Sequence, residues 1–147
     1  MTLEELDDRL PNGFHDAKLV SLSLDYVTRS ATLHIGLHVG TPDSLDPEEY
    51  KIAILRVTGL CFCTVELPCP GEPFLPDGSP VNVSGYPEDP KSFEKVNESL
   101  TKINGLLAKC PPGAWCYRFF SHDWNSFIHI AGTSVELLWR EAMDESR

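Results

Sequence analysis

Apolar and polar side chains alternate along two neighbouring segments near the start of the chain. In KLVSLSLDY, residues 18–26, and ATLHIGLHV, residues 31–39, every second side chain is apolar. A period of two residues is typical of strands with one buried and one exposed face. A short polar turn near residues 28–30 joins them, so the pattern predicts an antiparallel hairpin. The residues expected on its buried face are Val20, Leu22, Leu24, Tyr26, Ala31, Leu33, Ile35, Leu37 and Val39.

Six further segments have the composition of strands. YKIAILRVTG, residues 50–59, is apolar on both faces, which predicts a central strand. The others are LCFCTVELP (60–68), VNVSGY (81–86), WCYRFF (115–120), WNSFIHIA (124–131) and SVELLWR (134–140). Gly132-Thr133 joins the last two, and a two-residue loop with glycine first suits a type II′ hairpin turn. In that hairpin Ile130 would face Val135 and His129 would face Glu136.

Two segments have helical features. Thr2 and Glu5 match a capping box, and Leu3, Leu6 and Leu10 follow at helical spacing, which predicts a short N-terminal helix. Residues 90–109 predict the main helix, with Asp89 as N-cap and Pro90 at the first helical position. Its apolar stripe is Phe93, Val96, Leu100, Ile103 and Leu107.

These elements add up to an α+β fold. We expect a single domain over residues 1–147, with a mainly antiparallel, bent or partly closed sheet of about 7–8 strands. One main helix at 90–109 and the short N-terminal helix would accompany the sheet.

The charge of the chain is acidic and uneven. The formal net charge is −10, and residues 1–49 hold 3 Lys and Arg against 10 Asp and Glu. An acidic surface repels phosphate backbones, so we expect no nucleic-acid binding, whereas a basic protein partner would fit. Solubility alone also explains such acidity. The candidate partner surface is Asp7, Asp8, Asp43, Asp46, Glu48 and Glu49.

Composition also limits location and cofactors. No apolar run approaches the roughly 20 residues that span a bilayer, and the acidic start MTLEELDDRL does not resemble a signal peptide. We therefore expect a cytoplasmic protein without membrane contact. An odd number of cysteines favours free thiols, and their spacing does not fit structural zinc knuckles, so no metal or cofactor is expected. The five are Cys61, Cys63, Cys69, Cys110 and Cys116.

Two His-Asp pairs, His15-Asp16 and His122-Asp123, are the main candidates for chemistry. Metal phosphohydrolases carry such pairs on helices, whereas these precede or join strands. Two histidines and a carboxylate can form an open metal site if the strand ends meet. Alternatively, the aspartates organise turns through hydrogen bonds to the backbone. The candidate binding residues are His15, Asp16, His122, Asp123, Trp124 and Asn125.

Two stretches carry a resemblance. NGFHDAKLVSLSLDY and SHDWNSFIHIAG resemble the opening and closing segments of a group of small, uncharacterised bacterial proteins, to which no activity is attached. HDAKL, residues 15–19, resembles the start of the first strand in bacterial immunity-type proteins. The acidic N-terminal third, the lack of a catalytic set and the compact β scaffold predict a non-enzymatic interaction module of the immunity or antitoxin kind. The alternative is a small-ligand or metal-binding protein, such as a hydrolase, that uses the two His-Asp pairs.

Overall fold

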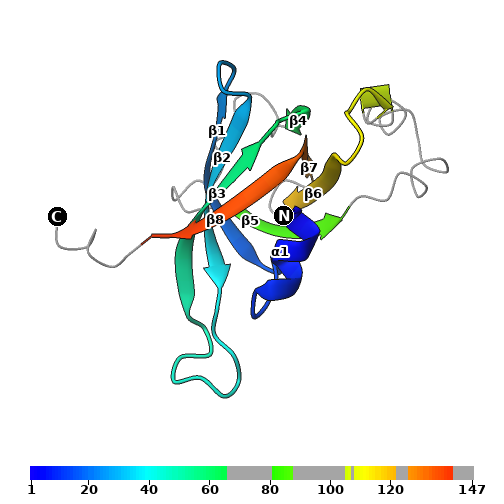
Figure 1. The fold of residues 1–147 in the computed structure, drawn as a ribbon. Helices are drawn as coiled ribbons and strands as arrows, with labels where there is room; N and C mark the ends of the chain where they lie inside the picture. Colours follow the sequence, from blue (N-terminus) through cyan, green and yellow to red (C-terminus); the bar gives the residue numbers. More distant parts are fainter. Residues whose placement is uncertain (66–80, 88–104, 107, 122–125, 141–147) are drawn as a thin grey trace.

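Within the residues that the structure describes, the main elements are eight strands and a short N-terminal helix, and Gly105, Leu106 and Ala108 are also helical (Figure 1). The computed structural model describes residues 1–65, 81–87, 105–106, 108–121 and 126–140. The elements are α1 (Leu3–Arg9), β1 (Ala17–Asp25), β2 (Ser30–His38), β3 (Tyr50–Thr58), β4 (Phe62–Val65), β5 (Val81–Pro87), β6 (Trp115–Ser121), β7 (Ser126–Gly132) and β8 (Ser134–Trp139). The strands form one 8-stranded sheet in the order β4-β7-β6-β5-β1-β2-β3-β8. Every pair of neighbours is antiparallel.

Strands β1, β2 and β3 confirm the predicted hairpin and the predicted central strand. β1 pairs with β2, and β3 lies between β2 and β8. On β2 the inward residues Ala31, Leu33, Ile35 and Leu37 are buried, as the alternation predicts. The outward positions carry Thr32 and His34, which are half-buried.

A β-bulge at Val20 shifts the pattern of β1. Leu19 pairs with Ile35 and Ser21 with His34, so Val20 is an extra residue without a partner on β2. The bulge brings Ala17 and Leu19 inward before it and Leu22 after it. Val20, Leu24 and Tyr26 are instead 53, 41 and 88% exposed, so their predicted burial is wrong.

The predicted hairpin between the last two strands is also wrong. β7 pairs with β4 and β6, whereas β8 pairs with β3 at the opposite end of the sheet order. Gly132 lacks the positive φ that a type II′ turn requires there. The glycine serves close packing, because a Cβ at this position would lie 2.6 Å from the Cγ1 of Val57. His129 therefore faces Arg118 and Thr64, and Glu136 faces Arg56.

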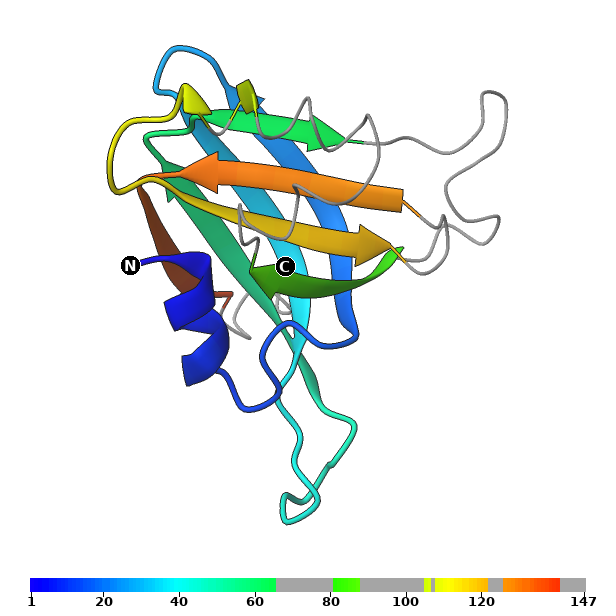
Figure 2. The same cartoon turned by 90° about the vertical axis from the view of Figure 1, so that its right-hand side faces the viewer.

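The sheet bends sharply where β3 leads to β4 and β7 leads to β8. Thr58 pairs with Ser134 on one side of the bend, and Phe62 pairs with Ala131 on the other. Gly59, with a φ of +61°, lies at the bend. The pairs β4–β7 and β3–β8 lie at opposite ends of the sheet order, although β3 continues into β4 and β7 continues into β8. Figure 2 shows β6 and β7 crossing over β2 and β3.

The inner faces of this bent sheet enclose the core, and α1 packs beside it. The helix has the predicted capping box of Thr2 and Glu5, and it buries Leu3 and Leu6. The fully or almost fully buried side chains include Phe14, Leu33, Ile35, Leu37, Leu55, Val57, Val83, Tyr117, Phe119 and Ile130. Nearly all of them come from strands.

The protein is a mainly-β fold, so the prediction of an α+β fold with one main helix is wrong. Because the sheet bends, its own faces cover one another, and the core described above needs no second layer of helix. Most of the helix expected at residues 90–109 lies outside the described residues, which exclude 88–104 and Leu107. The eight strands of the described residues agree with the expected number of about 7–8.

Candidate functional site

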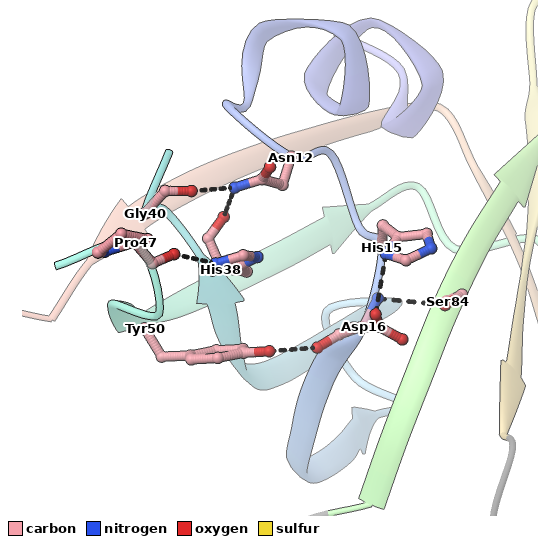
Figure 3. Close-up of polar contacts among 8 residues, drawn as sticks. All are labelled: Asn12, His15, Asp16, His38, Gly40, Pro47, Tyr50 and Ser84. Atoms are coloured by element: carbon pink, nitrogen blue, oxygen red, sulfur yellow. Dashed lines mark hydrogen bonds and ion pairs between the residues drawn. The ribbon is translucent and has the colours of Figure 1, made fainter. Parts of the chain in front are cut away.

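The segment that joins α1 to β1 holds the first His-Asp pair. Its beginning is fixed by two hydrogen bonds from the side chain of Asn12. The side-chain amide of Asn12 donates hydrogen bonds to the carbonyl oxygens of His38 at 2.9 Å and Gly40 at 2.8 Å. His38 is the last residue of β2, and Gly40 lies at the start of the loop between β2 and β3. Asn12 therefore fixes the start of that loop to the connection in front of the His-Asp pair (Figure 3).

Phe14 anchors the same segment in the core. Its ring is fully buried and makes edge contacts with Tyr117 and Phe119, at centroid distances of 5.7 and 5.5 Å. Its backbone N–H donates to the carboxylate of Asp7 at 2.7 Å. Gly85 makes room for the rings, because a Cβ there would lie 2.9 Å from the Cβ of Phe14.

His15 and Asp16 stand side by side on the surface. The Nδ1 of His15 lies 3.0 Å from the Oδ2 of Asp16, and the side chains are 76 and 56% exposed. Asp16 has a φ of +52°, a left-handed conformation that aspartate tolerates better than most residues. Its N–H donates to the hydroxyl of Ser84, and its carbonyl oxygen accepts from the hydroxyl of Tyr50 at 3.1 Å. The aspartate therefore shapes the turn, whereas His15 is presented to solvent.

Tyr50 links the pair to neighbouring polar side chains. Its ring stacks on His38 at a centroid distance of 5.1 Å, and the Nζ of Lys18 lies 4.3 Å from its centroid. Burial raises the pKa of the Tyr50 phenol, and the carboxylates of Asp16 and Glu48 raise it further. At neutral pH the phenol is therefore a hydrogen-bond donor, as its bond to Asp16 requires.

The structure does not describe the second His-Asp pair. His122, Asp123, Trp124 and Asn125 lie outside the described residues, so the predicted shared site stays a prediction. The register places the flanking residues. Ala17, which follows the first pair, faces Val83, and Val83 faces Ser121, which precedes the second pair. Ala17 and Ser121 are thus two strand spacings apart, about 10 Å.

The candidate partner surface divides between α1 and the loop of residues 39–49. Asp8, Asp43, Asp46 and Glu48 are exposed, whereas Asp7 and Glu49 are half-buried. The carboxylate of Asp7 holds the Phe14 N–H, so this residue supports the fold. Burial raises the pKa of the Tyr117 phenol, and the nearby Asp7 carboxylate raises it further.

The loop of residues 39–49 projects from one end of the molecule (Figures 1 and 2). At its base, the N–H groups of Val39 and Gly40 both donate to the carbonyl oxygen of Glu49. Nearer the tip, Ser44 donates twice to Thr41, through its N–H at 3.0 Å and its hydroxyl at 2.8 Å. These bonds give the loop a defined shape.

Leu45 lies within that loop and is fully exposed. Its flanking residues Asp43, Asp46 and Glu48 are also exposed. The acids were predicted from their charge, whereas the exposure of the leucine was not predicted. The signal that would have found it is an isolated apolar residue in the acidic stretch PDSLDPEE.

Two further properties of the described residues bear on a metal site and on a membrane-spanning helix. Within the described ranges, no three His, Cys, Asp or Glu side chains gather closely enough to hold a metal ion. No helix in the described part of the chain has the length and hydrophobicity needed to span a bilayer. No family model, curated protein or solved structure matches this chain.

Proposed function

We propose that this protein is a non-enzymatic interaction module of the immunity or antitoxin kind, which binds a basic protein partner. The contact surface is the loop of residues 39–49, and the exposed Asp8 of α1 contributes charge. The observation that carries the proposal is Leu45, a fully exposed apolar side chain held among carboxylates on a projecting loop.

The charges and the leucine have different tasks. Carboxylates such as Asp43 and Glu48 attract a basic partner from a distance and speed association. Leu45 then becomes buried in the complex, which contributes about 1.5–3 kcal/mol when burial is complete. An apolar centre within a polar rim is the usual composition of a protein interface.

The hydrogen bonds of the loop favour binding further. A flexible loop loses conformational entropy when a partner orders it, which weakens the complex. Here Asn12 holds the base, Ser44 bonds to Thr41, and the side chain of Asp46 accepts from the Glu48 N–H at 3.1 Å. Because the loop is already shaped, binding loses less entropy. The resemblance of HDAKL to immunity-type proteins supports the same proposal.

The test is calorimetric binding between the purified chain and basic proteins encoded by genes adjacent to its own. We expect Leu45→Ala to weaken binding about tenfold or more, since about 1.4 kcal/mol corresponds to a factor of ten. Leu24→Ala is the matched control, because Leu24 is also exposed but lies on β1 beside the β1–β2 turn, at the other end of the hairpin from the loop. Equal losses in both variants, or no binding by any such protein, would contradict the proposal.

A second candidate function is a small-ligand site at His15 and Asp16. The exposed pair at 3.0 Å and the row Ala17, Val83 and Ser121, which runs between the two His-Asp segments, support it. The experiment is metal analysis of the purified chain together with thermal-shift screening against a panel of metal ions and phosphates. A stabilising compound whose effect disappears in both His15→Ala and His122→Ala would favour this function over the first.

A further inference from the structure

Strand β8 ends the sheet and pairs along one edge with β3. The N–H of Arg140 donates to the carbonyl oxygen of Ile52 at 2.9 Å, and Leu138 and Glu136 face Ile54 and Arg56. Hydrogen-bonding pairs alternate along an antiparallel ladder. The backbone groups of residues 136, 138 and 140 therefore point toward β3, and those of residues 135, 137 and 139 point away from it.

The outer edge of β8 is partly open. The N–H of Val135 donates to the carbonyl oxygen of Met1 at 3.0 Å, so the N-terminus covers the beginning of the edge. Among the residues that the structure describes, none pairs with the outward backbone groups of Leu137 and Trp139. Leu138 and Trp139 are 58 and 42% exposed. An open edge with apolar side chains is a template for another strand.

The sequence of β8 is complementary to that of a second, antiparallel copy of itself. We infer that two copies of this chain pair through β8 in antiparallel register, with Leu138 opposite Leu138 of the second copy. In this register Glu136 lies opposite Arg140 of the second copy, and Leu137 lies opposite Trp139. The symmetry repeats both pairs, so each charge meets an opposite charge on one face while the apolar pairs share the other.

Hydrogen bonding and charge together choose this register. Leu137 and Trp139 have the open backbone groups, so they must face each other or themselves across the new pair. Placing Leu137 opposite itself sets Glu136 against Leu138, and placing Trp139 opposite itself sets Arg140 against Leu138. Both alternatives leave the charges without an opposite charge. In the proposed register, Leu137 and Trp139 also form hydrogen bonds in both directions, which extends the sheet across the two copies.

Charge reversal tests the pairing, with sedimentation velocity over a range of concentrations as the readout. We expect the wild-type chain to self-associate, and Glu136→Arg or Arg140→Glu to raise the dissociation constant at least tenfold. Each single variant places like charges opposite one another. An equimolar mixture of the two variants has every charge matched, so we expect it to associate as the wild type does. The double variant Glu136→Arg with Arg140→Glu should also recover association.

Matched controls separate the edge from general effects of charge. Asp43→Arg and Lys109→Glu make the same kinds of change at exposed sites away from β8, and they should leave self-association unchanged. Glu136 also faces Arg56 within one copy, so thermal unfolding must show that each variant is folded. Recovery in the mixture is decisive, because misfolded variants would not restore each other.

Three results would overturn the inference. The first is a wild-type chain that stays monomeric at every concentration. The second is a mixture of the two charge variants that fails to associate while both are folded. The third is self-association that begins only after removal of residues 141–147, which would mean that the chain's own C-terminal segment occupies the edge.

Discussion

The residues of NGFHDA, Asn12 to Ala17, divide between fold and surface. Asn12 ties down the β2–β3 loop, Phe14 fills the core and Asp16 shapes a left-handed turn. Only the side chain of His15 is turned to solvent without a task in the fold that the described residues reveal. A motif that attracts attention for its His-Asp pair is thus largely a folding motif, and any chemistry it performs depends on His15.

Substitution of neighbouring residues should separate these tasks. Phe14→Ala removes a fully buried ring and should lower the free energy of unfolding by about 3–5 kcal/mol. His15→Ala should change it by less than about 0.5 kcal/mol, because the ion pair with Asp16 is largely exposed. Urea denaturation followed by tryptophan fluorescence measures both. A large loss in His15→Ala would show that the pair supports the fold after all.

The reactivity of the Cys63 thiol reports how well the core is shielded from solvent. Burial raises the pKa of its thiol to about 11, whereas an unfolded cysteine titrates near 8.5. Since the thiolate is the reactive form, Cys63 should react with iodoacetamide far more slowly in the folded chain at pH 8 than in urea. Its rate should then rise about tenfold per pH unit up to about pH 11. Peptide mass spectrometry after timed alkylation measures the rate, and equal rates in both states would contradict the assignment.

At the scale of elements, the bend between β7 and β8 shapes the sheet. Gly132 passes against Val57 and Thr58, where a side chain has no room. We expect Gly132→Ala to destabilise the fold by about 1–3 kcal/mol through overpacking. Gly105→Ala is the control, because a Cβ there meets no atom within 4 Å. Thermal unfolding compares the two, and equal stability would show that the bend tolerates a side chain.

The same elements show what the sequence can predict. Alternation predicted β1 and β2, because β2 buries every second side chain and β1 does so on either side of its bulge, whereas β3 was predicted from apolar residues on both faces. Alternation misplaced Val20, because a bulge adds a residue without leaving a mark in the pattern. It also misplaced Leu24 and Tyr26, because alternation does not show where β1 leaves the core and ends. The sequence predicted a β7–β8 hairpin because it does not distinguish a glycine in a tight turn from a glycine required by close packing, such as Gly132. The acidic residues of the loop were identified from charge, but the exposure of Leu45 depends on a loop shape set by contacts between distant residues.

At the scale of the whole molecule, the acidic loop and the open edge of β8 lie near the same end of β3. The loop leads into Tyr50, and Ile52, two residues later, bonds to Arg140. In antiparallel pairing through β8 the two Arg140 residues lie on opposite sides of the two-fold axis at Leu138, so the two loops of residues 39–49 lie at opposite ends of the paired strands. A dimer would therefore carry one acidic loop at each end, so self-association would leave both loops accessible to a basic partner.

Ionic strength should separate the charges of this surface from Leu45. The Debye length shortens from about 10 Å at 0.1 M salt to about 3 Å at 1 M, so added salt should slow association with a basic partner. Dissociation should change little with salt, whereas Leu45→Ala should accelerate it, since contact packing is lost.

Asp43→Asn combined with Glu48→Gln should weaken the salt dependence of the association rate. Asp25→Asn changes an exposed acid at the end of β1, at the other end of the hairpin from the loop, and should leave it unchanged. Stopped-flow kinetics gives both rates, and a salt dependence that responds equally to all these acids would mean that net charge, and not this loop, steers the partner.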